Sequence, residues 1–461
     1  MKTGILRVVI IIAIFQRKIY QDLLDWKENA DGKSALLIEG ARRVGKSTVA
    51  EEFAKREYKD YLLLDFSKTS PELQKNFIDN IGDLTVFFRN LMLLTGKELP
   101  EGSLIIFDEV QFFPRARQAI KHLVKDGRYH YLETGSLISI KKNVKDILIP
   151  SEEESVSMYP MDFEEFLWAT GNTVTIPVIL EAFNARKPLG DAVHRKVMEQ
   201  FRTYMAVGGM PQAVEAFVNG QTYRQIDRIK RGILRLYESD LRKYDEEDNG
   251  KAAAVFRTIP QQLTGRNSHF KYAVVEKGSR ASQYTETMQW INESGMANVC
   301  FNVTDPEISL DLFADSNNMK LYMGDTGLLV TQVFQSEKST GDDIYKALIF
   351  NKLGINQGMI VENIVAQMLK RNGHGLYFHE FDYQEEGNRK PNRYEVDFLL
   401  VKNKGLCPIE VKASGYQSHK SFDYFAKKYS VKIRERYIIY TKDMKIDGDI
   451  TFLPLYMTMF L

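Results

Sequence analysis

Short apolar runs alternate with amphipathic stretches along the first third of the chain. The runs lie within residues 33–40, 61–66, 103–110 and 129–136, and apolar residues recur at helical spacing between them. Fully apolar strands that alternate with helices are typical of a parallel sheet covered on both faces. The pattern therefore predicts an α/β domain with a parallel sheet over residues 20–175.

The pattern becomes mainly helical over residues 176–345, where 223–243 and 286–303 are the clearest helical stretches. Residues 271–301 predict a small helix-turn-helix or winged-helix unit, a module that either binds DNA or packs against neighbouring domains. We therefore expect a helical, winged-helix-like middle domain.

A second α/β unit is predicted over residues 346–461. It begins with an amphipathic helix and continues with short apolar runs that are typical of strands. The predicted helices are 358–373 and 421–429, and the predicted strands are 375–381, 394–401, 407–413 and 435–441.

Composition limits the class of protein. With 44% hydrophobic and 27% charged residues and a net charge of +1, the chain is typical of a soluble globular protein without a global attraction to nucleic acid or membranes. Its two cysteines, Cys300 and Cys407, exclude a disulfide framework and fit a cytoplasmic location. The apolar run at 8–15 is too short to span a bilayer, so we expect residues 1–19 to be an extension and no membrane partner.

The stretch GARRVGKST at 40–48 follows a predicted strand and precedes a predicted helix. It has the spacing of a phosphate-binding loop, in which backbone N–H groups and a lysine contact phosphates while a hydroxyl binds Mg²⁺. The predicted ligands are ATP and Mg²⁺, and the predicted nucleotide-binding residues are Gly40, Arg43, Val44, Gly45, Lys46, Ser47 and Thr48.

An acidic pair, Asp108 and Glu109, ends the apolar strand at 103–110. We expect Asp108 to hold Mg²⁺ together with Ser47, and Glu109 to activate the attacking water. At the end of the next strand, Thr134 or Ser136 is a candidate to lie between the water and the γ-phosphate, or simply to form a turn.

Hydrolysis also needs a positive charge near the transferred phosphate. The candidates are Arg115 and Arg117, acting in their own chain or from a neighbouring subunit, and Arg42 and Arg43 within the loop. Each of them has a structural or solvent-exposed role as its alternative.

The predicted strands at 394–401 and 407–413 carry a second set of charged residues. Joined by the turn sequence KNKG, they predict a hairpin on which Asp397 lies across from Glu410 and Lys412. Two carboxylates and a lysine suit Mg²⁺-dependent hydrolysis of phosphodiesters, and Glu362 adds a carboxylate from the preceding helix. The alternative is a charged rim or an inactive binding module.

Residues 223–243 carry seven Lys or Arg and three Asp or Glu. Such a helix either contacts nucleic-acid phosphates or has a structural role, as a solvated face or as a surface that faces the acidic stretch 244–250. We favour the structural role.

The motifs IEGARRVGKST, IIFDEVQ, ETGS, YPMDFEEFLW, YMAVGGMPQAV, KLYMGDTGLL, VENIVAQMLK and EVDFLL…IEVK occur in this order. In this order they resemble archaeal and bacterial AAA-type ATPases with a C-terminal DUF4143 domain. The resemblance covers residues 17–440 and implies a P-loop ATPase core, a helical and winged-helix-like middle and a C-terminal fold like the PD-(D/E)XK nucleases. Many members carry a Gly-Arg pair before the P-x-x-F-E-E-F stretch, whereas this chain is acidic there, at 150–160.

The sequence therefore predicts an ATP-binding, ATP-hydrolysing protein whose nucleotide state controls a nuclease-like module, with DNA or RNA as a partner of the middle and C-terminal domains. One alternative is an ATP-regulated, Mg²⁺-dependent nuclease acting on DNA or RNA. The other is a nucleotide-switched binding module without turnover. Related ATPases commonly form rings, so a homo-oligomer is compatible with this interpretation.

Overall fold

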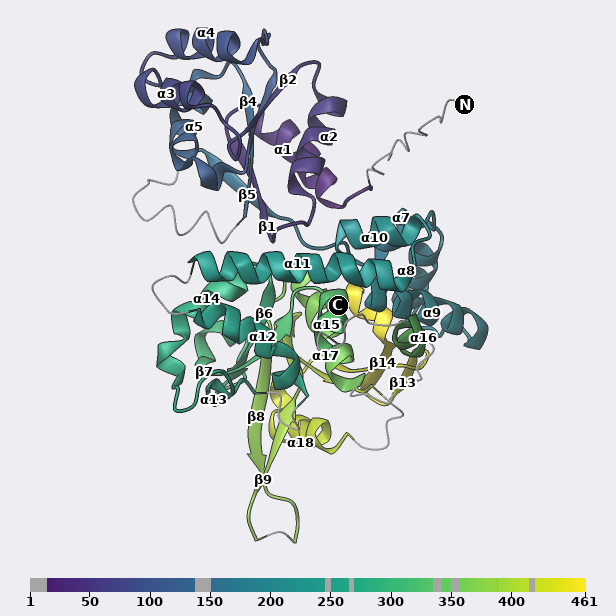
Figure 1. Cartoon of the computed structure of the whole chain (residues 1–461). Coiled ribbons are helices and arrows are strands. Elements are labelled where there is room, and N and C mark those ends of the chain that lie inside the picture. The colour runs from purple at the N-terminus through teal and green to yellow at the C-terminus, as the bar shows by residue number, and fades with distance from the viewer. Residues whose placement is uncertain are drawn as a thin grey trace, which may run out of the picture.

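A computed structural model describes most of the chain and arranges it as an upper α/β body above a larger lower body (Figure 1). The described residues are 15–136, 151–244, 250–264, 269–334, 342–349, 357–387, 389–413 and 419–461. The carboxyl end of β1 points toward the long helix α11, which runs between the two bodies (Figure 1). The loop after β1 therefore lies where the two bodies meet.

The upper body contains a five-stranded sheet in which every pairing is parallel, in the order β2-β3-β4-β1-β5. The strands are β1 (Ala35–Gly40), β2 (Tyr61–Asp65), β3 (Leu104–Asp108), β4 (His130–Ser136) and β5 (Glu153–Ser157). This confirms the predicted parallel α/β domain. Because β4 lies between β1 and β3, its carboxyl end separates the phosphate-loop motif from the acidic pair.

Helices cover both faces of this sheet, as its apolar strands require. They are α1 (Ile19–Ala30), α2 (Lys46–Glu57), α3 (Pro71–Asp79), α4 (Leu84–Thr95), the 3₁₀ helix η1 (Val110–Phe112) and α5 (Pro114–Asp126). One core, with Phe77, Phe87 and Phe107, packs α3, α4 and α5 on one face. The core on the other face continues without a break into the lower body.

A group of helices follows the first sheet. They are α7 (Phe163–Ala169), α8 (Thr175–Ala185), α9 (Asp191–Val207), α10 (Pro211–Val218), α11 (Tyr223–Tyr244) and α12 (Lys251–Leu263). The interpretation of α11 as a solvated basic face is wrong for Lys230, which is buried and donates to the carbonyls of Ala206 and Gly327 at 2.7 and 3.0 Å. Of the neighbouring acidic stretch, 245–249 lies outside the described residues.

A four-stranded sheet in the order β7-β6-β8-β9 joins the middle segment to the C-terminal one. Its elements, with the short helices before them, are α13 (Tyr272–Val275), η2 (Ala281–Gln283), α14 (Thr285–Glu293), β6 (Ala297–Val303), η3 (Leu310–Phe313), β7 (Ala314–Met323), β8 (Tyr377–Tyr383) and β9 (Asn392–Val396). The predicted helix 286–303 is thus wrong in its second half, because the apolar run after Gly295 pairs with β7. The pairing of β6 with β8 crosses the predicted domain boundary at 345.

The C-terminal segment adds a five-stranded sheet in the order β10-β11-β12-β14-β13. Its elements and their neighbours are α15 (Thr326–Val333), α16 (Asp342–Ile349), α17 (Gln357–Arg371), β10 (Phe398–Lys402), β11 (Gly405–Val411), α18 (Lys420–Lys428), η4 (Ser430–Lys432), β12 (Arg436–Tyr440), β13 (Lys445–Asp447), β14 (Ile450–Pro454) and η5 (Leu455–Phe460). The predicted hairpin is present as β10–β11, whose turn residues Asn403 and Lys404 both have positive φ. The predicted single strand 394–401 is wrong, because it is divided at Asp397 between β9 and β10, which belong to different sheets.

In the described part of the chain, no helix is both long and apolar enough to cross a membrane. The apolar run 8–15 lies outside the described residues apart from Phe15.

Candidate nucleotide site and carboxylate cluster

The loop between β1 and α2 has a backbone that few side chains allow. Gly40 has φ 152°, and a Cβ placed there would lie 2.2 Å from the carbonyl oxygen of Met158. Arg43 and Gly45 have φ 70° and 104°, in the left-handed region. These conformations turn the chain sharply into the first turn of α2, whose free N–H groups are suited to bind an anion.

Lys46 begins α2 and is 6% exposed. Its ammonium donates to the carbonyls of Gly40 and Ala41, both at 3.0 Å. Burial lowers the Lys46 pKa to about 8, against the opposing effect of the carboxylates of Glu109 and Asp108. The Lys46 ammonium therefore lies against the loop, at the position from which the lysine of a phosphate-binding loop contacts phosphate.

Ser47, at the start of α2, and Asp108, at the end of β3, meet in space although β4 lies between β1 and β3. The Ser47 hydroxyl donates to Oδ1 of Asp108 at 2.6 Å. Thr134, on β4, donates to the same oxygen at 2.5 Å and accepts from the backbone N–H of Glu109 at 3.2 Å. Thr134 therefore contacts both acidic residues, whereas Ser136 lies half-buried at the end of β4.

Glu109 adopts a left-handed backbone conformation, with φ 56°. This is uncommon for a residue with a side chain and stores strain that the surrounding structure must hold. The Glu109 carboxylate accepts a hydrogen bond from Gln111 and lines the cavity beside the loop.

The arginine candidates lie in different surroundings. Arg117 forms a buried ion pair with Glu153, with nitrogen–oxygen distances of 2.5 and 2.8 Å. Arg42 pairs with Asp240 of α11 at 2.8 Å, and Arg115 is exposed. Arg43 is exposed and lines the cavity beside Lys46.

Arg17 contacts the loop as well, although no motif marks it and it precedes the predicted domain start at residue 20. Its guanidinium donates to the carbonyls of Val44 and Tyr159, both at 2.7 Å, and to Glu165 at 3.1 Å. Its side chain is 4% exposed and that of Glu165 is fully buried. Sequence reasoning missed this residue because two of its three partners, Tyr159 and Glu165, lie more than a hundred positions away.

A cavity of about 460 Å³ lies beside the loop. The upper body contributes Arg43, Gly45, Lys46, Ser47, Thr48 and Glu109, among others, and α10 contributes Pro211, Gln212 and Glu215. A second cavity of about 700 Å³ shares Phe15, Arg17 and Val49 with it. The lower body thus contributes one wall of the cavity through α10, which the sequence did not predict.

The charged residues of the hairpin also come together. Asp397 lies between β9 and β10, and its Oδ2 accepts from the N–H of Val411 at 2.7 Å. Lys412 donates to Glu410 at 2.6 Å. Burial, and then the nearby carboxylates of Glu410 and Glu362, raise the Asp397 pKa far above its usual range.

Glu362 reaches this cluster from α17. It accepts a hydrogen bond from the hydroxyl of Tyr322 at 3.2 Å, and burial raises its pKa. The buried Lys320, which sequence reasoning missed, contributes positive charge to Glu362 and Asp397. Among the described residues, the carboxylates of Glu362, Asp397 and Glu410 do not have ligand atoms that all lie within 4.8 Å of one another.

Comparison with protein families assigns three parts of the chain. Residues 32–167 match a model described as an AAA domain. Residues 198–339 match a domain of unknown function, DUF8612, and residues 357–458 match another, DUF4143. A comparison with curated proteins finds no match.

Among solved structures, the Walker-type ATPase PABY2304 of Pyrococcus abyssi is similar over 69% of this chain and 96% of its own, with 13% identity and a TM-score of 0.41. The Holliday junction branch migration motor RuvB of Thermotoga maritima covers 61% of this chain and 89% of its own, with 12% identity and a TM-score of 0.29. The Aeropyrum pernix ORC1 protein, solved in complex with DNA, covers 72% of this chain and 95% of its own, with 12% identity and a TM-score of 0.25.

Proposed function

We propose that this chain, which combines an AAA-type P-loop ATPase domain with a C-terminal DUF4143 domain, binds ATP with Mg²⁺ and hydrolyses it. The observation that carries the proposal is the contact between Ser47 and Asp108 at 2.6 Å, beside a buried Lys46. A hydroxyl and a carboxylate oxygen at this distance are the donors that Mg²⁺ prefers next to phosphates.

In this proposal, backbone N–H groups of the loop and Lys46 bind the phosphates, and Ser47 and Asp108 hold Mg²⁺, which supplies charge neutralisation when bound. Glu109 orients and deprotonates the attacking water. Thr134 holds Asp108 and the backbone of Glu109 in place through its hydroxyl. Among the described arginines that line the cavity, Arg17 is buried and Arg42 is paired with Asp240, whereas Arg43 is exposed, so we assign Arg43 to the nucleotide.

We further propose that the nucleotide state is transmitted to the C-terminal module. Arg17 joins the Val44 carbonyl to Glu165, and Arg371 approaches the same Glu165 carboxylate at 3.5 Å. Arg371 ends α17, the helix that also carries Glu362 of the carboxylate cluster. A change at the loop therefore reaches α17 through the buried Arg17 and the half-buried Arg371, which share one carboxylate.

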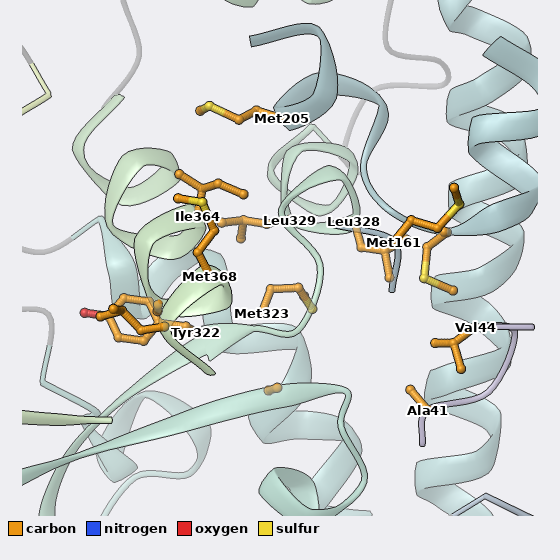
Figure 2. Close-up of a cluster of buried hydrophobic side chains, with 14 of the residues drawn as sticks. Ala41, Val44, Met161, Met205, Tyr322, Met323, Leu328, Leu329, Ile364 and Met368 are labelled. Atoms are coloured by element: carbon orange, nitrogen blue, oxygen red, sulfur yellow. The ribbon is translucent and has the colours of Figure 1, made fainter. Parts of the chain in front are cut away.

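Apolar packing supports the same route. The side chains drawn in Figure 2 belong to one continuous core that extends from the loop to α15 and α17. Along this core lie Ala41, Val44, Met161, Leu328, Ile364 and Met368. Close-packed cores transmit displacements because they do not deform freely.

Two variants test the ATPase proposal. Lys46→Ala is expected to abolish binding of a fluorescent ATP analogue, whereas Glu109→Gln should preserve binding and slow phosphate release by about 10²-fold or more. The exposed Glu101→Gln is a control with the same chemical change. Hydrolysis at the wild-type rate by Glu109→Gln contradicts the role of Glu109. Nucleotide binding without phosphate release by the wild type favours a switched binding module without turnover.

A second candidate function is Mg²⁺-dependent cleavage of DNA or RNA at the carboxylate cluster. It is favoured by the convergence of Asp397, Glu410 and Lys412, with Lys412 held at 2.6 Å from Glu410. Here Glu362, Asp397 and Glu410 would have to move closer together than they lie in this structure to hold one metal ion, and Lys412 would lie beside the attacking water.

Incubation of plasmid, single-stranded DNA and RNA with Mg²⁺ or Mn²⁺, with and without ATP, tests this function. Cleavage should be lost in Asp397→Asn and Lys412→Ala and retained in Lys427→Ala, which changes an exposed lysine of α18. Cleavage that survives both of the first two variants excludes this cluster.

Light scattering with and without ATP tests whether the chain forms a homo-oligomer.

A further inference from the structure

Two glutamates lie directly opposite each other on the four-stranded sheet, away from the nucleotide site. Glu380 on β8 and Glu395 on β9 are register partners in an antiparallel pair. Like charges at directly opposed positions destabilise a sheet unless a cation compensates them. The two carboxylates nevertheless lie close together, and each already pairs with a cation of the chain, Glu395 with Lys320 and Glu380 with Arg393.

His269 lies between the two carboxylates. Its Nε2 is 2.8 Å from Oε1 of Glu380 and 3.2 Å from Oε2 of Glu395, and it is a buried atom without an aligned hydrogen-bond partner. The three atoms lie within 4.8 Å of one another. The ring nitrogen therefore lies close to one oxygen of each carboxylate.

The outer atom of each of these side chains is held by another residue. Asn318 accepts from Nδ1 of His269 at 2.7 Å and donates to Oε2 of Glu380 at 2.9 Å. Lys320 donates to Oε1 of Glu395 at 2.5 Å, and Arg393 donates to Oε2 of Glu380 at 2.5 Å. With the outer atoms satisfied, one atom of each side chain remains to face the common centre. Second partners of this kind orient ligands in metal sites.

We propose that His269, Glu380 and Glu395 bind a divalent transition metal ion of the Zn²⁺ type. One imidazole nitrogen and two carboxylate oxygens suit Zn²⁺, and the imidazole disfavours Mg²⁺ and Ca²⁺. All three residues are half-buried, so water completes the fourth position. The ion relieves the repulsion between the paired glutamates and fixes the chain before α13 onto the sheet.

This site is distinct from the carboxylate cluster, although Lys320 connects them. The same lysine that binds Glu395 is close enough to Glu362 and Asp397 to affect their pKa values. A protonated His269 that forms ion pairs with both glutamates is the competing arrangement, in which no metal binds.

The test is Zn²⁺ binding to the full chain without a histidine tag, after treatment with EDTA, by equilibrium dialysis and metal analysis. We expect one tightly bound Zn²⁺ per chain, and at least tenfold weaker binding in His269→Gln and in Glu395→Gln. The exposed His122→Gln is the control for adventitious binding to a surface histidine. Co²⁺ should give the visible absorption of a four-coordinate site in the wild type and lose it in His269→Gln.

The proposal is overturned if the wild type binds no stoichiometric Zn²⁺, or if His269→Gln binds as the wild type does. It is also overturned if Asp397→Asn, rather than His269→Gln, abolishes binding, because the ion would then lie in the carboxylate cluster. None of these outcomes depends on ATP hydrolysis, so the site and the proposed function succeed or fail separately.

Discussion

Arg17 holds the nucleotide loop against the rest of the protein, and its removal has a calculable effect. Arg17→Ala deletes two hydrogen bonds from a charged donor to the Val44 and Tyr159 carbonyls, and a buried ion pair with Glu165. Charge-assisted hydrogen bonds contribute about 1.5–3 kcal/mol each, and breaking a buried ion pair costs about 3–5 kcal/mol. Because Arg371 still reaches Glu165 at 3.5 Å, part of the loss is compensated. We expect a net loss of about 3–5 kcal/mol in the unfolding free energy.

Urea unfolding followed by tryptophan fluorescence measures this loss, since Trp168 lines the same cavity as Arg17. With a slope of about 2–3 kcal/mol per molar urea, the midpoint of the transition should fall by about 1–2.5 M. The same variant should bind ATP more weakly, because the Val44 carbonyl loses the donor that orients it.

Lys18→Ala is the matched control. Lys18 is next in sequence and pairs with Asp162 and Glu164, but its side chain is 34% exposed, so its pairs contribute little, roughly 1 kcal/mol or less. Equal midpoint shifts in the two variants, or a shift below about 0.5 M in Arg17→Ala, would refute the reasoning.

Three further outcomes follow from single positions. Gly40→Ala should lower ATP affinity at least tenfold in a titration with the fluorescent ATP analogue, because the added Cβ would lie 2.2 Å from the Met158 carbonyl oxygen. Gly82→Ala is the control and should leave the affinity unchanged, because no atom lies within 4 Å of a Cβ added there. The Lys46 pKa of about 8 implies that the ammonium loses its charge above pH 8, so ATP affinity should fall up to tenfold per pH unit from there, and constant affinity to pH 9.5 would contradict this. Asp397→Asn should stabilise the metal-free protein by about 1 kcal/mol or more at pH 8. A raised pKa in the folded state means that stability is lost as pH rises, so this gain should shrink toward pH 5, which thermal unfolding measures.

Local sequence carried the prediction of the first sheet and of its loop. The periodicity of apolar residues located strands β1 to β4 and helix α2. It could do so because the apolar residues of all these elements are buried in or against the same sheet. The motif was expected to precede a helix, and the structure confirms that helix, which begins at Lys46 within the motif. Residues 297–303 were misread because a short apolar run fits a buried helix and a buried strand equally well, and only pairing with β7 decides between them.

The sequence by itself determined the fold of the ATPase body, the β10–β11 hairpin and the residues of the phosphate loop, because these depend on contacts and torsions close along the chain. Tertiary structure decided which charged groups meet. In the folded chain, Thr134 lies between the loop and the acidic pair. Arg117 is paired with Glu153. Arg17 and α10 line the nucleotide cavity. The physical reason is that electrostatic and hydrogen-bond partners are chosen by distance in space, which the order of strands in a sheet sets and local periodicity does not record.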